Sequence, residues 1–134
     1  YKISNHNSTQ LTTGTLKLAI ENRHPTKSLL FHSDQGSNYI SGQFRKLLKL
    51  YSIQQSFSNP GTPYDNSVME SFFGGFKREE LYRHEYTSIK SFRESVDKYM
   101  SFYNNDRPHS ILSNRTPNSY ESEYFSNSKE KQEC

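Results

Sequence analysis

Apolar residues recur along the first half of the chain in patterns that predict two helices with a strand between them. Ser8 and Thr9 are suitable N-caps for a helix over residues 10–22. Residues 28–32 form a nearly continuous apolar run, which predicts a strand buried on both faces, and residues 35–38 have turn composition. From Ser41 onward, apolar residues recur at i, i+3, i+4 and i+7, which indicates an amphipathic helix. The residues expected to face inward are Leu11, Thr15 and Leu18 in the first helix and Phe44, Leu47, Leu48 and Tyr51 in the second.

The second half of the chain continues with one more strand and two more helices. Residues 53–57 read as a second strand, and residues 58–66, rich in proline, glycine and asparagine, predict a loop. A helix follows the loop, and a longer one is predicted over residues 88–104. Residues 121–134 are rich in Ser, Glu and Lys, and we expect a disordered tail there. The apolar positions of the two helices are Val68, Met69, Phe72, Phe73 and Phe76, and then Ile89, Phe92, Val96, Tyr99 and Tyr103.

This order of elements is typical of an α/β fold in which helices cover a sheet. Two strands make a thin sheet, so we expect further strands upstream of this segment or in a partner. The 134 residues have the length of one domain, but the hydrophobic fraction of 31% is low for an independent core. The mean hydropathy of −1.00 is likewise low for a chain that forms an independent core. We therefore expect residues 1–120 to form part of a domain rather than a complete one.

The remaining bulk properties exclude several classes of protein. The net charge of +3 is compatible with a polyanion partner such as DNA, but many proteins share it. Cys134 is the only cysteine, which excludes a disulfide or thiolate site within one chain and favours a reducing compartment. A zinc site built from His32, His84 and His109 would lack any recognised ligand spacing. No apolar run approaches membrane-spanning length, so we expect no membrane partner.

Two carboxylates are the strongest chemical signal. Asp34 directly follows the first predicted strand, at the sheet edge where open α/β folds place ligands, and Glu70 lies on a predicted helix. Two such side chains brought together supply hard oxygen ligands for a shared divalent cation. Each also has a simpler interpretation. Asp34 can bind its own backbone in an Asp-Gln-Gly turn, and Glu70 can close a Ser-x-x-Glu capping box with Ser67.

A polar and basic group surrounds Glu70 in the sequence. Asn66, Glu70 and Lys77 are spaced to lie roughly along one helix face. A lysine two turns beyond an acidic metal ligand is placed to meet a phosphate, although Lys77 can equally be a solvated lysine among its charged neighbours. The loop before Asn66 can be a mobile gate over a site or a plain connector.

Four stretches of the chain, running from near residue 10 to near residue 120, match one known pattern when they are taken together. They resemble the integrase catalytic core of bacterial insertion-sequence transposases of the orfB type, which is related to the retroviral integrases. The stretches are Phe31-His32-Ser33-Asp34-Gln35-Gly36-Ser37-Asn38-Tyr39; Gly61 through Tyr64-Asp65-Asn66-Ser67-Val68-Met69-Glu70-Ser71-Phe72-Phe73; Lys77-Arg78-Glu79; and Tyr103-Asn104-Asn105 with Arg107, His109, Leu112 and Pro117.

The resemblance implies a ribonuclease H-like fold, of which this chain holds the C-terminal part of the sheet and its helices. It also implies a triad of two aspartates and one glutamate that binds two Mg²⁺ or Mn²⁺ ions when complete and cleaves and transfers DNA strands. By that match Asp34 is the second aspartate and Glu70 the glutamate. Lys77, with Arg78, would contact the DNA end, and Asn66 would help to hold the loop of the site. The implied partners are DNA, both element ends and target, and further copies of the full-length transposase in the bacterial cytoplasm, associated with the nucleoid.

The chain departs from the family pattern at several positions. The family's first aspartate lies on the first strand of the sheet, whereas the only acid before Asp34 here is Glu21, within a predicted helix. Gln35 replaces the usual arginine, and a Gly-Gly pair at residues 74 and 75 falls inside the predicted helix that carries Glu70 and weakens it. We therefore expect that the N-terminal part of the core is missing and that this chain is inactive alone.

Two interpretations of the chain remain open. It is either a segment of a transposase catalytic domain that acts only within a full-length protein, or a non-catalytic remnant of a decayed element that binds DNA or pairs with an intact transposase. An in-frame coding segment upstream that bears strands and an aspartate supports the first, and a stop codon or frameshift there supports the second. An unrelated ribonuclease H-like nuclease fits the fold but not the Tyr-Asn-Asn…Arg-Pro-His ending.

Overall fold

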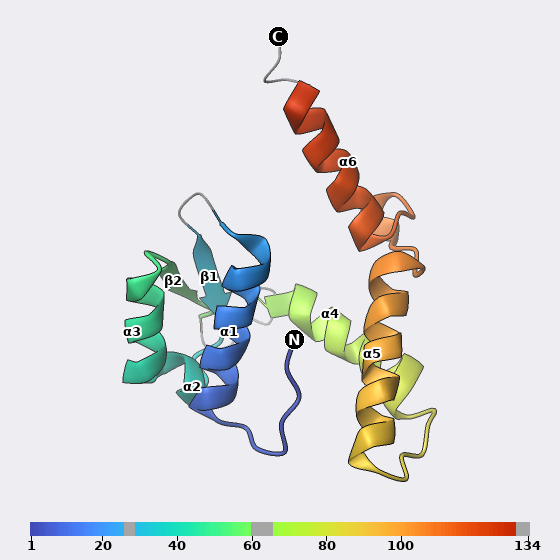
Figure 1. Ribbon diagram of the computed structural model, residues 1–134, viewed down its shortest axis with the longest axis horizontal. Coiled ribbons are helices and arrows are strands. Elements are labelled where there is room, and N and C mark those ends of the chain that lie inside the picture. Colours follow the sequence, from blue (N-terminus) through green and yellow to red (C-terminus); the bar gives the residue numbers. More distant parts are fainter. Residues whose placement is uncertain (26–28, 60–65, 131–134) are drawn as a thin grey trace. The chain divides into compact units, whose positions relative to one another are not determined.

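The chain folds as two units, Tyr1–Phe72 and Phe73–Cys134, in a computed structural model that describes residues 1–25, 29–59 and 66–130. The first unit contains α1 (Thr9–Arg23), β1 (Leu30–Ser33), α2 (Ser37–Ile40), α3 (Gly42–Leu50), β2 (Gln54–Phe57) and the start of α4 (Ser67–Phe76). The second contains the π-helical turn η2 (Lys77–Leu81), α5 (Ile89–Asn105), the 3₁₀ turn η3 (Ser110–Leu112) and α6 (Pro117–Glu130) (Figure 1).

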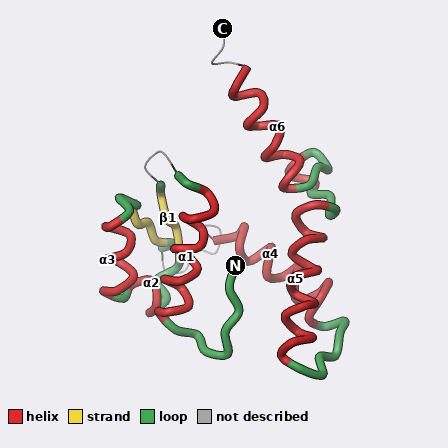
Figure 2. The backbone as a smooth tube through the Cα atoms, in the orientation of Figure 1, coloured by secondary structure: helices red, strands yellow, loops and turns green. Residues whose placement is uncertain are grey.

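The two strands of the first unit form a parallel pair. Leu30 lies opposite Gln54 and Ser33 lies opposite Phe57, so the carboxyl ends of both strands reach the same edge. Figure 2 shows these two strands, in yellow, among helices and loops in the described part of the chain. Parallel strands need a crossover connection, which α2 and α3 supply between them. The predicted α/β order is confirmed.

The core of the first unit lies between the strand pair and two helices. Phe44 and Leu48 of α3 and Ile53 before β2 are buried, and Phe44 is completely so. The rings of Phe31, Tyr39 and Phe44 pack together with centroids 5.2 to 5.9 Å apart. This aromatic contact fixes β1, and therefore the residue that follows it, against α2 and α3.

The side chains of α1 that contact the core differ from the predicted ones. Thr13 is buried, and the half-buried Leu16 and Ile20 pack against the core cluster. The expected Leu11, Thr15 and Leu18 are also half-buried but are not part of that cluster. The Thr13 hydroxyl donates a 2.8 Å hydrogen bond to the Thr9 carbonyl. A threonine whose hydroxyl is satisfied in this way can be buried, and a pattern read from apolar residues alone misses it. The predicted cap is confirmed, because Ser8 accepts from the Leu11 backbone N–H.

The prediction that β1 is buried on both faces is wrong. Phe31 packs on the core, but Leu30 is 63% exposed and His32 is exposed. In the described residues α1 and α3 join a single hydrophobic cluster on one side of the strand, so alternate side chains point away from it. Tyr51, also expected inward, is the C-cap of α3 and is 41% exposed.

The second unit is built on α5, which confirms the long helix predicted there. Ser88 caps it, and Ser88 and Ser91 form a reciprocal capping box. Val96 and Tyr99 are buried on its inner face, and the Tyr99 ring lies 5.0 Å from the Phe76 ring. These contacts hold the turn η2 beside α5.

The C-terminal region differs from the expected disordered tail in its described part. Residues 117–130 form α6, which begins shortly after the bridge between His109 and Arg115 and contacts the end of α5 near its own start (Figure 1). The ring of Tyr120 lies 4.7 Å from the Arg115 guanidinium. Residues 131–134 lie outside the described residues. Among the helices described, none has the length and apolar character needed to cross a bilayer.

Candidate functional site

Asp34 stands at the carboxyl edge of the parallel strand pair, directly after β1. Its side chain is exposed, and its Oδ1 accepts a 2.9 Å hydrogen bond from the Gly36 backbone N–H. This is the turn contact that the simpler interpretation of Asp34 predicted. The turn orders the carboxylate without removing it from solvent, so the two interpretations of Asp34 are compatible.

Gly36 keeps this carboxylate in place by having no side chain. A Cβ at residue 36 would lie 2.9 Å from Asp34 Oδ1 and 3.5 Å from the Tyr39 ring. Burial, and then the negative charge of Asp34, raise the pKa of Tyr39 above its ordinary value. The carboxylate, the glycine and the tyrosine therefore form one packed corner at the end of β1.

A second set of hydrogen bonds joins the ends of β1 and β2 beside Asp34. His32 Nδ1 lies 3.0 Å from Ser56 Oγ, and His32 Nε2 lies 3.1 Å from Ser58 Oγ. The side chain of Gln35 donates to the Ser58 carbonyl at 3.4 Å. These contacts tie the turn of Asp34 to the segment that leaves β2. The loop considered as a gate continues into residues 60–65, which lie outside the described residues.

Glu70 lies in the first turn of α4 and is exposed, and Asn66, just before α4, is half-buried. The capping-box interpretation of Glu70 stays a prediction. Among the described residues there is no group of three or more His, Cys, Asp or Glu side chains that could hold a metal ion.

Lys77 and Arg78 open the turn η2 directly after α4, and both are exposed. The next two residues turn inward, since Glu79 is half-buried and Glu80 is 7% exposed. The turn is π-helical, closed by a 2.9 Å bond from the Tyr82 N–H to the Lys77 carbonyl. Single π turns in helices occur often at functional sites.

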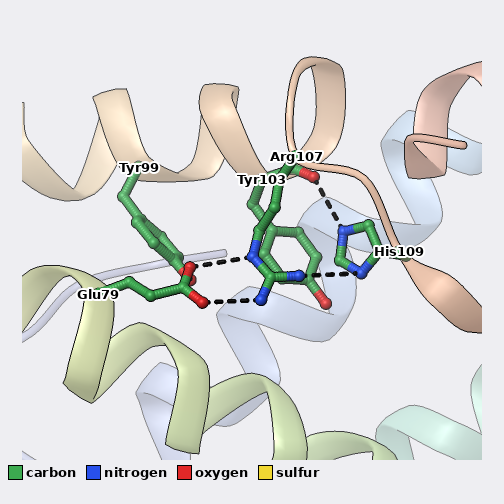
Figure 3. Close-up of polar contacts among 5 residues, drawn as sticks. All are labelled: Glu79, Tyr99, Tyr103, Arg107 and His109. Carbon is green, nitrogen blue, oxygen red and sulfur yellow. Dashed lines mark hydrogen bonds and ion pairs between the residues drawn. The ribbon is translucent and has the colours of Figure 1, made fainter. Parts of the chain in front are cut away.

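The side chain of Glu79 is hydrogen-bonded by Tyr99 of α5 and by Arg107, two residues after the end of α5 (Figure 3). Arg107 donates through Nε to Oε2 at 3.0 Å and through Nη2 to Oε1 at 2.7 Å, a bidentate pair. The Tyr99 hydroxyl donates to Oε2 at 3.0 Å. Arg107 Nη1 lies 3.4 Å from His109 Nδ1, and the guanidinium lies 5.7 Å from the centre of the Tyr103 ring. In the sequence Glu79 is one of the charged neighbours of Lys77, and no spacing there indicates this cluster.

The electrostatics of the cluster follow from these contacts. The hydrogen bond from Arg107, reinforced by Tyr99, holds the pKa of Glu79 below its ordinary value. Burial and the neighbouring Glu79 carboxylate raise the pKa of Tyr99 to about 12. The hydrogen bond to Glu79 raises the pKa of Arg107 further. Glu79 and Arg107 are therefore a charged pair throughout the neutral range.

Glu80 has its own set of partners. The hydroxyls of Tyr86 and Ser95 both donate to Oε1, the former at 3.0 Å. His84 Nδ1 lies 3.3 Å from the same oxygen. The two adjacent carboxylates of η2 thus contact Ser95 and Tyr99, which are one helical turn apart on α5.

Comparison with known protein families gives two overlapping matches. Residues 1–63 and residues 51–117 each match a family described as "Integrase core domain". The second match covers half of the chain, and together the two cover all of residues 1–117. The predicted family is confirmed.

Curated relatives with transposase names match most of the chain. A transposase for insertion sequence element IS904 of Lactococcus lactis (strain IL1403) is 36% identical over 73% of this chain and 39% of its own length. A putative transposase InsK for IS150 of Escherichia coli K12 is 31% identical over 93% of this chain and 44% of its own length. The chain thus spans less than half the length of these relatives.

One relative has a name of another kind. A protein of Lactococcus lactis named "ATP-dependent protease" is 46% identical over 74% of this chain and 33% of its own length. That name disagrees with the family matches and with the two transposase names. We give the family matches more weight, because they cover the chain from residue 1 to residue 117.

Two solved structures with a similar fold are retroviral integrase catalytic core domains. The catalytic core domain of BIV integrase aligns with a TM-score of 0.65 at 18% identity, over 94% of this chain and 80% of that one. The HTLV-2 integrase catalytic core domain, a dimeric form in complex with magnesium, aligns with a TM-score of 0.52 at 15% identity, over 87% of this chain and 69% of that one. At this identity the likeness establishes the fold, and the predicted ribonuclease H-like class is confirmed.

Proposed function

Because this chain belongs to the integrase core domain family together with insertion-sequence transposases, we propose that it is a segment of a transposase catalytic domain. Within the full-length protein this segment serves metal-dependent cleavage and transfer of DNA strands. The observation that carries the proposal is the family match over residues 1–117, joined to an exposed and ordered Asp34 carboxylate at the end of β1.

Asp34 and Glu70 are the carboxylates that this segment contributes to the site. Both are exposed, and oxygen donors of this kind suit Mg²⁺ or Mn²⁺, which in such sites activates the attacking oxygen and stabilises the leaving one. Two carboxylates alone do not complete a site for two ions, and the described residues hold no larger group of ligands. The residues of this chain therefore account for part of a metal site, and no catalytic step follows from them alone.

Lys77 and Arg78 hold the backbone of the DNA end. Both are exposed cations at the start of a turn whose two acidic residues face inward, which supports an outward basic pair. Contacts of this kind give salt-sensitive and largely sequence-independent binding. Asn66, at the start of α4, helps to hold the preceding loop.

The partners of the full-length protein are the element ends, the target DNA and further copies of itself, in the bacterial cytoplasm at the nucleoid. Residues 1–120 form the C-terminal portion of the catalytic core. A second candidate is a non-catalytic remnant that binds DNA or pairs with an intact transposase.

The proposal is tested by a cleavage assay on labelled element-end DNA in Mg²⁺ or Mn²⁺. The chain as given is compared with the chain extended by the sequence encoded in frame upstream of it. We expect no cleavage by the chain alone, and cleavage by the extended chain that Glu70→Gln abolishes. Metal-dependent cleavage by the chain alone, or activity of the extended Glu70→Gln variant, contradicts this proposal. A stop codon or frameshift immediately upstream supports the non-catalytic candidate instead.

A further inference from the structure

The motif Tyr-Asn-Asn…Arg-Pro-His, at residues 103–109, includes none of the residues to which the proposed function assigns a role. Its arginine is a cation close to the basic turn η2, and a DNA contact is the first role that its charge suggests. The structure argues against that role. Arg107 uses Nε and Nη2 on the two oxygens of Glu79, and its Nη1 lies within hydrogen-bonding distance of His109.

The contacts of Arg107 are with side chains of its own chain, Glu79 and His109, which hold its guanidinium in place (Figure 3). The side chains of Arg107 and Glu79 are each 30% exposed. Because a guanidinium can only donate, His109 Nδ1 accepts from Arg107, and Nε2 then donates to the Tyr103 carbonyl at 3.4 Å. The Tyr103 and His109 rings pack edge to face with centroids 4.6 Å apart. Tyr103 and His109 of the motif thus orient the side chain of Arg107.

The partner of that arginine sits in the turn that carries the basic pair. Glu79 is the third residue of η2, one position after Arg78. The π-helix is rare and occurs mostly as single turns within α-helices, so contacts from outside the helix can help to hold such a turn in place. Glu79 receives that support from Arg107 and Tyr99, and Glu80 receives it from Ser95 and Tyr86.

We propose that Glu79 and Arg107 are positioning residues for Lys77 and Arg78. The bidentate pair fastens η2 to the end of α5, so that the two carboxylates of the turn face inward and its two cations face outward. Arg107 itself makes no DNA contact. This inference rests on the proposed function, because it takes Lys77 and Arg78 to be the residues that hold DNA.

The experiment measures two properties of the full chain. DNA affinity is measured by fluorescence anisotropy with a labelled double-stranded oligonucleotide in EDTA, over a series of salt concentrations. The hydrogen exchange of the Tyr82 amide, which closes the π turn on Lys77, is measured by NMR. The variants are Glu79→Gln, the milder Tyr99→Phe, and the pair Lys77→Ala with Arg78→Ala. Glu94→Gln is the matched control, because it makes the same charge change in the exposed pair with Lys90.

We expect Glu79→Gln to weaken DNA binding about tenfold, a coupling of the size found between contacting residues, and to speed exchange of the Tyr82 amide. Tyr99→Phe, which removes one hydrogen bond and keeps the ion pair, has a smaller effect of the same kind. Glu94→Gln changes neither property. In a chain that already carries Lys77→Ala and Arg78→Ala, Glu79→Gln has no further effect on DNA affinity, although a merely structural role would still lower it.

Three results would overturn the inference. The first is a Glu79→Gln chain that binds DNA as tightly as wild type or more tightly, which would make Arg107 a DNA ligand that Glu79 restrains. The second is a loss of affinity that persists without Lys77 and Arg78. The third is unchanged exchange of the Tyr82 amide. If removing Lys77 and Arg78 leaves DNA affinity unchanged, the proposed function fails together with the inference, whereas the first two results leave the proposed function standing.

Discussion

Arg107 binds both carboxylate oxygens of Glu79, at 2.7 and 3.0 Å, across 28 positions of sequence. This pair links the basic turn η2 to the segment that follows α5. It is partly screened from solvent, and it is bonded further by Tyr99 and His109. A pair of this geometry depends on the planar fork of arginine.

The first prediction is that Arg107→Lys destabilises the second unit although it keeps the charge. An ammonium cannot form the planar pair of parallel hydrogen bonds with both oxygens and cannot stack in the same way on Tyr103. We expect the free energy of unfolding to fall by about 1 to 3 kcal/mol, measured by urea denaturation. Lys90→Gln, which breaks the exposed pair with Glu94, should change it by less than about 0.5 kcal/mol. Equal effects of the two substitutions would contradict this account.

The second prediction concerns the stability of the folded chain at low pH. The pKa of Glu79 is lower in the folded chain than its ordinary value of 4.5, because Arg107 and Tyr99 donate to the carboxylate. A carboxyl with a lowered folded pKa adds stability above its unfolded pKa, and that stability is lost as the pH falls through the folded pKa. Urea denaturation of wild type should therefore show stability falling below pH 4.5 more steeply than in Glu79→Gln. Identical acid slopes for the two chains would be inconsistent with the pair.

The third prediction concerns the stability of the folded chain at high pH. Tyr99 has a pKa of about 12 in the folded chain against an ordinary 10.0, because burial and Glu79 disfavour the phenolate. A raised folded pKa means that stability present below pH 10.0 is lost as the pH rises to about 12. Thermal unfolding of wild type and Tyr99→Phe over this range should show a smaller alkaline loss in the variant. A tyrosine population that ionises near pH 12 in absorbance titration should also disappear in Tyr99→Phe.

The fourth prediction separates the turn formed by Asp34 from its proposed role in the site. Asparagine retains an Oδ1 that can accept from the Gly36 N–H, so Asp34→Asn should leave stability within about 0.5 kcal/mol of wild type. Asp34→Ala removes the acceptor and should cost about 0.5 to 1 kcal/mol, measured by urea denaturation. In the extended chain both variants should lose cleavage. Cleavage retained by Asp34→Asn would limit Asp34 to a structural role.

Much of the fold could be predicted from the sequence because it depends on local signals. The recurrence of Phe44, Leu47 and Leu48 places α3, and Ser41 and Ser88 accept the backbone N–H bonds expected of N-caps. Asp34 follows a strand and makes the turn contact that its Asp-Gln-Gly context indicates. Each of these features involves residues within a few positions of one another.

The features that sequence reasoning missed depend on distant partners. The contacts of Glu79 could not be predicted from the sequence, because its partners Tyr99 and Arg107 lie 20 and 28 positions away. The π turn also changes which residues face α5, and the spacing of apolar residues in the sequence does not predict such a turn. The exposure of Leu30 follows from which side of β1 the helices cover, and an apolar run of this length does not specify that.

The central claim is that Asp34 and Glu70 are catalytic carboxylates of a transposase core to which this chain contributes. The most direct measurement is Mg²⁺-dependent cleavage of element-end DNA by the extended chain, with Asp34→Asn and Glu70→Gln set beside Asp97→Asn and Glu94→Gln, matched changes at exposed acids of α5. We predict that the first two substitutions abolish cleavage while DNA binding in EDTA persists, and that the other two leave cleavage unchanged. Cleavage that survives Glu70→Gln or Asp34→Asn would contradict the claim.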